Sequence, residues 1–150
     1  QLNPKHVGAY NNRGSTLKQL GRHEQAFVSY KRAAQLQPIN PLTYNNMGIV
    51  LNDLRKLNAS ISSYKRAIEL RPNYADAHYN LAVAFTALKK FDPAISSYKK
   101  AIKLKENYLL AFSGLGRLLL QTGFHKDGLK MLRRGDGIIS FDVKNGLGIE

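Results

Sequence analysis

The sequence predicts an all-α solenoid of about four helix–turn–helix repeats that ends in a short β-like tail. The first observation behind this prediction is periodicity, because Tyr10, Tyr44, His78 and Phe112 lie 34 residues apart, a length typical of helix-pair repeats. The second observation is that whole strings recur at the same step, as VSYKRAAQL, SSYKRAIEL and SSYKKAIKL. The third is that small and large residues keep fixed places in each period, at the spacing of one helix face.

The second helix of each repeat carries a column of tyrosines followed by a column of alanines. Three residues separate the two columns, in the pairs Tyr30 with Ala33, Tyr64 with Ala67, and Tyr98 with Ala101. Residues three apart share one helix face, so both columns are expected to pack inward. On the first helix, Gly14 and Gly48 let that helix approach its partner closely. Pro38 and Pro72 end the second helix, because proline cannot continue one.

The period also sets the expected boundaries. Residues 1–6 (QLNPKH) match residues 35–40 (QLQPIN), so they are expected to end a preceding repeat. The remaining segments are three regular repeats at 7–40, 41–74 and 75–108, a degenerate fourth repeat at 109–136, and a non-helical tail at 137–150. In the third repeat, Asp92 and Pro93 are predicted to be the N-cap and first residue of the second helix.

The fourth repeat and the tail depart from the pattern. Leu132 replaces the tyrosine, and Gly128 and Gly135 occupy columns of small residues. Because glycine weakens a helix by up to about 1 kcal/mol, the second helix of this repeat is expected to be short or frayed. The tail is rich in β-formers before a turn signal, at Ile138, Ile139, Phe141, Val143 and Lys144-Asn145-Gly146. It is either a small hairpin or the first strand of a following domain.

The repeat resembles the tetratricopeptide repeat family, whose 34-residue helix–turn–helix has these small, large and proline positions. The resemblance covers about residues 7–142. It implies a right-handed superhelix in which the first helices line a concave groove for peptides and the second helices form the convex side. The implied activity is protein–protein interaction, with no catalytic role for this chain.

Composition narrows the class of protein. The sequence has no cysteine, so it offers neither a disulfide framework nor a thiolate metal site. No apolar run approaches the roughly 18 residues of a membrane span, and the cytoplasm is the favoured compartment. The four histidines lack metal-ligand spacing, and His78 is expected to pack between helices. No catalytic motif, metal site or cofactor site is evident, and the oligomeric state is left open.

The net charge of +13 suggests that the protein binds nucleic acid or an acidic partner. Basic pairs recur every 34 residues on the second helix, as Lys31-Arg32, Lys65-Arg66 and Lys99-Lys100. They are interpreted first as a solvated convex ridge. A nucleic-acid surface usually interleaves free aromatic residues with its charge, and the tyrosines here are needed for packing. Nucleic-acid binding is therefore disfavoured, and specific binding through this ridge is not expected.

A column of asparagines on the first helix is the candidate binding site. Asn12, Asn46 and Asn80 lie in register although asparagine is a mediocre helix former. Their amides suit a peptide backbone of any sequence, and the arrangement looks like the asparagine ladder of O-linked N-acetylglucosamine transferases. The alternative is that the amides tie adjacent helices together. The full predicted groove is Asn11, Asn12, Ser15, Asn45, Asn46, Ile49, Tyr79, Asn80 and Val83.

Three functions remain open at this point. The favoured one is a scaffold that binds an extended peptide segment in the groove. The second is a substrate-presenting or regulatory arm of a larger enzyme, such as a glycosyltransferase or hydroxylase. The third is binding of nucleic acid or an acidic partner by the basic ridge. Binding of chaperone C-termini is disfavoured, because that subclass uses Lys and Arg at groove positions that here hold residues such as Asp76 and Asn80.

Overall fold

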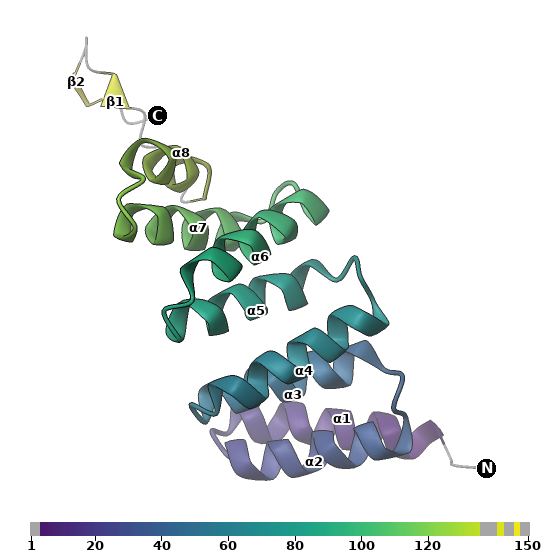
Figure 1. Cartoon of the computed structure of the whole chain (residues 1–150). Coiled ribbons are helices and arrows are strands. Elements are labelled where there is room, and N and C mark those ends of the chain that lie inside the picture. The colour runs from purple at the N-terminus through teal and green to yellow at the C-terminus, as the bar shows by residue number, and fades with distance from the viewer. Residues whose placement is uncertain (1–3, 136–140, 143–145, 148–150) are drawn as a thin grey trace.

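The computed structural model describes residues 4–135, 141–142 and 146–147. Eight helices stack in chain order in these residues, from α1 at one end to α8 at the other (Figure 1). The first helices of the four pairs are α1 (Pro4–Gln19), α3 (Pro41–Asp53), α5 (Ala75–Ala87) and α7 (Leu109–Gln121). The second helices are α2 (His23–Leu36), α4 (Leu57–Leu70), α6 (Phe91–Leu104) and α8 (His125–Gly135). The predicted helical repeat solenoid is confirmed.

Within a pair, the two helices pack through the predicted tyrosine column. Tyr30, Tyr64 and Tyr98 are 1%, 2% and 4% exposed. A Cβ added at Gly48 would lie 2.5 Å from Cε1 of Tyr64, and one added at Gly14 would lie 2.8 Å from Cε1 of Tyr30. Such distances are far inside van der Waals contact, so glycine is needed where the tyrosine ring crosses the first helix.

Between pairs, each second helix also packs against the first helix of the next pair, and three apolar clusters follow one another along the stack. Tyr98 illustrates the sharing of one side chain between repeats. It lies in the same apolar cluster as Ala82 of its own repeat, and a Cβ at Gly114 of the next repeat would lie 2.7 Å from its ring. Stability in such an array depends on nearest-neighbour interfaces rather than on one central core.

Helix ends follow the sequence signals with one exception. The helices α2 and α4 end two residues before Pro38 and Pro72, as predicted. The exception is α6, which begins at Phe91 after Lys90 as N-cap, and that cap makes no side-chain hydrogen bond. The prediction of Asp92 as N-cap was wrong. Proline is tolerated throughout the first helical turn, where its missing N–H has no partner to lose, so Pro93 does not fix the start.

A left-handed residue joins the two helices of every pair. The turn residues share one column and have positive φ angles, which are 71° at Gly21, 60° at Arg55, 57° at Lys89 and 88° at Gly123. This conformation costs L-residues with a side chain about 1 kcal/mol. The second and third repeats therefore carry a small backbone strain that the glycines of the first and fourth avoid.

The two ends of the described chain differ from the regular repeats. The helix α1 begins at Pro4, three residues before the predicted repeat boundary, because proline suits the first position of a helix. At the other end, β1 (Phe141–Asp142) pairs antiparallel with β2 (Gly146–Leu147). This pairing is a small hairpin. The predicted β-formers Ile138, Ile139 and Val143, with Lys144 and Asn145 of the predicted turn, lie outside the described residues.

Candidate functional site

The predicted groove residues lie on the first helices of three consecutive repeats. The helix α1 carries Asn11, Asn12 and Ser15, α3 carries Asn45, Asn46 and Ile49, and α5 carries Tyr79, Asn80 and Val83. These nine residues are called the first-helix face below. Because α1 contacts α3 and α3 contacts α5, the structure places the three sets side by side along the stack.

Two hydrogen bonds join the amides of this face across repeats. The Nδ2 of Asn80 donates to Oδ1 of Asn45 over 3.0 Å, and the Oγ1 of Thr43 donates to Oδ1 of Asn11 over 3.0 Å. Asn11 also donates to the carbonyl of Val7 in its own helix. Asn45 is only 4% exposed, so little of it is left for a ligand. The Asn80 bond corresponds to the alternative interpretation of the column, because it ties α5 to α3.

The other two ladder asparagines are in a different situation. Asn12 is exposed and Asn46 is half-buried. Within the described residues, neither side-chain amide makes a hydrogen bond to protein. Each amide keeps two donors and one acceptor for a partner. The column is therefore divided, with Asn12 and Asn46 open and Asn80 partly used as a tie.

An aromatic cluster closes the end of the first-helix face at the third and fourth repeats. The Tyr79 ring lies 5.2 Å from the Tyr108 ring and 5.9 Å from the Tyr98 ring, measured between centroids. Burial raises the pKa of Tyr108, and the neighbouring carboxylate of Asp76 disfavours the phenolate further. Tyr79 is thus held by packing on one side while it remains half-exposed on the other, which gives a rigid aromatic surface beside Asn80.

The second helices present a different surface. All six members of the three basic pairs are exposed. Arg66 lies over the ring of Tyr44 at 6.0 Å, and Arg134 lies over the ring of Phe112 at 4.5 Å. Each arginine therefore lies over an aromatic ring of the neighbouring first helix.

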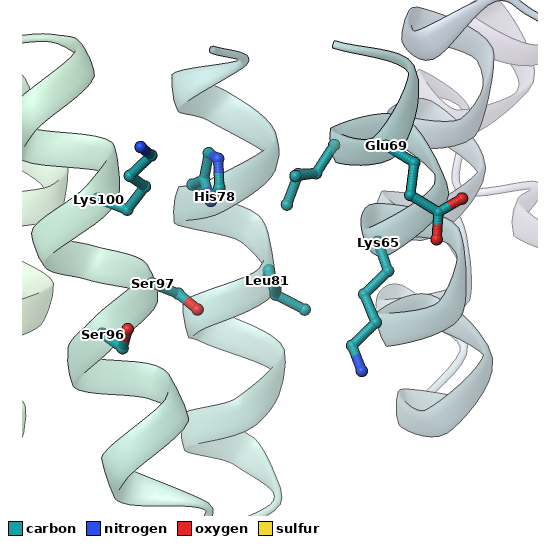
Figure 2. A pocket seen from close by; sticks show the side chains of 8 residues that line it. Lys65, Glu69, His78, Leu81, Ser96, Ser97 and Lys100 are labelled. Carbon is teal, nitrogen blue, oxygen red and sulfur yellow. The ribbon is translucent and has the colours of Figure 1, made fainter. Parts of the chain in front are cut away.

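Two open crevices lie between consecutive second helices. The first, called the upstream crevice, lies between α4 and α6 over α5 and has a volume of about 410 Å³. Figure 2 shows Lys65 and Lys100 on its two walls, with His78 and Leu81 of α5 between them. It is lined by Lys65, Ile68, Glu69, His78, Leu81, Ser96, Ser97 and Lys100. His78 is half-buried and lines this open crevice, with Nε2 3.0 Å from the carbonyl oxygen of Pro72 in the preceding loop.

The second, called the downstream crevice, repeats this arrangement one step along, between α6 and α8 over α7. Its volume is about 370 Å³. It is lined by Lys99, Ile102, Lys103, Phe112, Leu115, Leu119, Asp127, Met131 and Arg134. Seven of the positions stand one 34-residue period after those of the upstream crevice, as Lys99 after Lys65, Ile102 after Ile68, Lys103 after Glu69, Phe112 after His78, Leu115 after Leu81, Met131 after Ser97, and Arg134 after Lys100.

In the residues that the structure describes, no group of three or more His, Asp or Glu is placed to hold a metal ion. No helix in the same part of the chain has the length and hydropathy needed to cross a membrane. Sequence reasoning missed Thr43 and Tyr108 as partners of the first-helix face. Thr43 stands in a column of alanines, and that break in the column was the available signal.

Comparisons with known proteins agree on the type of repeat. A family model described as TPR repeat matches residues 14–54 and 50–88, and one described as Tetratricopeptide repeat matches residues 75–108. No curated protein sequence matches the chain.

Solved structures with the same fold are numerous. A crystal structure of MamA has a TM-score of 0.82 and 26% identity, and the match covers 89% of this chain and 78% of MamA. MamA from Desulfovibrio magneticus RS-1 has a TM-score of 0.78 at 19% identity, covering 88% and 78% of the two chains. The first TPR of Spaghetti (RPAP3), solved bound to an HSP90 peptide, has a TM-score of 0.79 at 20% identity, covering 81% and 97%.

Proposed function

The chain belongs to the tetratricopeptide repeat family, and we propose that its first-helix face binds an extended segment of a partner polypeptide. Repeats of this family mediate protein–protein interaction. The observation that carries the proposal is the pair of open amides at Asn12 and Asn46, which stand in register on neighbouring first helices. A non-catalytic scaffold at work in the cytoplasm is the corresponding role.

The spacing of the first helices suits an extended ligand. Packed helices lie about 10 Å apart, and an extended peptide advances about 3.3 Å per residue. One open amide per repeat would therefore meet the ligand backbone about every third residue. Because each amide would grip backbone N–H and C=O groups, its contribution would depend little on ligand side chains.

The half-exposed apolar residues supply selectivity in this proposal. Ile49 and Val83 occupy equivalent places in the second and third repeats, and each packs against an apolar cluster on its buried side. Tyr79 adds a fixed aromatic surface in the third repeat. Asn11 and Asn45 are assigned the supporting role of ties, and Ser15 interacts with the buried Tyr30 hydroxyl.

The test uses a peptide selected by display against the intact chain and titrated against variants. Each hydrogen bond contributes on the order of 1 kcal/mol, so Asn12→Ala with Asn46→Ala should weaken binding roughly thirtyfold. The melting temperature should not fall, since alanine suits a helix at least as well. The matched control is Asn58→Ala with Asn107→Ala, two exposed asparagines away from this face. Equal binding by both double variants would contradict the proposal.

Adding Asn80→Ala separates the two roles of the column. Because Asn80 donates to Asn45, its loss removes a tie and should lower the melting temperature as well as the affinity. A substrate-presenting arm of a larger enzyme would use the same face, so the ladder variants would then lower the turnover of protein substrates by the parent enzyme while leaving a free small-molecule acceptor unaffected.

A further inference from the structure

The two residues of each basic pair serve different crevices. Lys99 lines the downstream crevice and the adjacent Lys100 lines the upstream one. Consecutive residues project about 100° apart around a helix of 3.6 residues per turn, so a doublet on a second helix reaches both sides of it. The recurrence of the pair every 34 residues therefore builds two cationic walls for each crevice, one from each neighbouring repeat.

The positive charges on these walls are available to a partner. Within the described residues, no ion pair engages Lys65, Lys99, Lys100 or Lys103. The one acid on the upstream walls, Glu69, is paired with Arg66 at 2.9 Å. The downstream crevice has three basic residues against one acid, so it has the larger positive charge.

The floor of each crevice is aliphatic in part, beside His78 upstream and Phe112 downstream. Ile68 and Leu81 form the aliphatic part upstream, and Ile102 and Leu115 form it downstream. Met131 widens the apolar part of the downstream crevice at a place where the upstream crevice has Ser97. When an aliphatic side chain of a partner covers such a floor, the binding free energy becomes more favourable in proportion to the apolar area removed from water.

We propose that the outer crevices form a second interaction surface, separate from the first-helix face, for a polypeptide segment that combines acidic and aliphatic residues. The acidic side chains would pair with the lysine walls, and the aliphatic side chains would enter the floors. A nucleic acid fits this surface less well. Phosphates would use only the walls, and the Phe112 ring in the downstream crevice is 3% exposed and lies under Arg134.

The proposed spacing defines a probe. Neighbouring crevices are one repeat apart, and the second helices that flank them do not contact one another, so their separation exceeds the roughly 10 Å of two directly packed helices. Two aliphatic residues four positions apart in an extended chain lie about 13 Å apart on the same side of it, so they would reach both crevices. The probe is a fluorescein-labelled glutamate peptide with two leucines at that separation. Its reference is an all-glutamate peptide of equal charge. Fluorescence anisotropy at about 0.15 M salt, where exposed charges are well screened, should show about tenfold tighter binding of the leucine peptide.

Charge reversal in the downstream crevice tests the walls. Lys99→Glu with Lys103→Glu should weaken binding of the leucine peptide about tenfold. The control variant is Lys126→Glu with Lys130→Glu, which makes the same charge change at exposed positions outside both crevices and should cost less than threefold. Equal losses in the two variants would show that only net charge matters, and would overturn the proposal.

Two further variants test the floor and the separation from the first-helix face. Met131→Gln should reduce the preference for leucine over glutamate while leaving the charge unchanged. Asn12→Ala with Asn46→Ala should bind the probe normally, so the proposal for the crevices and the proposal for the first-helix face are tested independently. Equal affinity for the all-glutamate peptide would contradict the proposal. So would tighter binding of a single-stranded oligonucleotide or of vesicles containing anionic lipid.

Discussion

The second and fourth repeats solve the same packing problem with different residues. In the second repeat, the Tyr64 ring lies against Gly48. In the fourth, Gly116 occupies the same place on the first helix but faces Leu132 and the backbone of Gly128. The described part of the second helix has 11 residues in α8, and α4 has 14. One repeat fills space with a large ring, and the other brings two backbones close together.

This comparison changes the meaning of two glycines. From sequence, Gly128 and Gly135 were expected only to weaken a helix. Both are buried, and a Cβ at Gly135 would lie 2.4 Å from the backbone nitrogen of Ser113. A Cβ at Gly128 would lie 3.0 Å from the backbone oxygen of Gly116. The lower helix propensity is real, but it accompanies close contact between α7 and α8.

The largest expected effect comes from the tyrosine column. Tyr64→Ala should lower the free energy of unfolding by about 3–5 kcal/mol, as large aromatic truncations in cores do. Leu132→Ala should cost about 2 kcal/mol or less, because Leu132 is only half-buried. Urea denaturation measures both. Equal costs would show that the two repeats are packed alike, and the comparison would fail.

The glycines of the fourth repeat should give the next largest effect. Gly135→Ala should destabilise by about 1–3 kcal/mol, since the added methyl meets backbone that cannot move aside easily. Helix propensity alone predicts the opposite effect, an increase in the free energy of unfolding of up to about 1 kcal/mol. The control is Gly8→Ala, where a Cβ would meet nothing within 4 Å. Stabilisation by both substitutions would support the propensity reading of Gly135.

Alkaline pH should weaken the packing around the buried tyrosines, including Tyr108 at the start of α7, more than the contact between α7 and α8. Burial raises the pKa values of Tyr30, Tyr64 and Tyr98, and the charge of Asp53 adds to the shift at Tyr64. Above pH 10 the unfolded tyrosines lose protons that the folded ones keep, so stability falls as pH rises. At pH 11 the loss should be about 1 kcal/mol at Tyr64, where the shift is large. Hydrogen exchange would locate it, and Tyr64→Phe should reduce it.

The smallest effect concerns the turns. Arg55 and Lys89 hold positive φ angles where the first and fourth repeats have glycine. Arg55→Gly should therefore stabilise the second repeat slightly, by less than about 1 kcal/mol, because strain relief is partly offset by the entropy of the unfolded chain. Gly123→Ala should have the opposite sign in the fourth repeat. The melting temperatures of the two variants would detect both changes. If both substitutions changed the melting temperature in the same direction, the left-handed turns would not be strained as described.

The fold was predictable because each column has a simple physical meaning. Tyrosine against glycine, and proline after a helix, can be seen directly in a 34-residue alignment of the chain with itself. The candidate site was less predictable. Asn12 and Asn80 stand in one column, yet one amide is open and the other bonds to Asn45. That difference depends on whether a neighbouring helix offers a polar partner. An alignment of the repeats does not show this, because it does not show which side chains of different repeats lie close together.

The crevices could not be predicted from the sequence either, because they depend on how neighbouring repeats stack. A doublet such as Lys99-Lys100 can be seen in the sequence, but its division between two sides of a helix depends on how repeats stack. The predicted solvated ridge describes the exposure of these lysines correctly. It omits the aliphatic floors beside them, which are formed by residues from three different helices.

The shared walls have a consequence for how such a surface could grow. A crevice belongs to the junction of two repeats, so a single repeat has none, and duplication of one 34-residue unit adds one junction. Lengthening the gene by whole units would extend the outer surface in equal steps without any new side chain having to evolve. A partner with tandem copies of the acidic and aliphatic motif would then bind best when its number of motifs equals the number of crevices. If the two numbers differed, lysines or aliphatic floors at one end would have no partner.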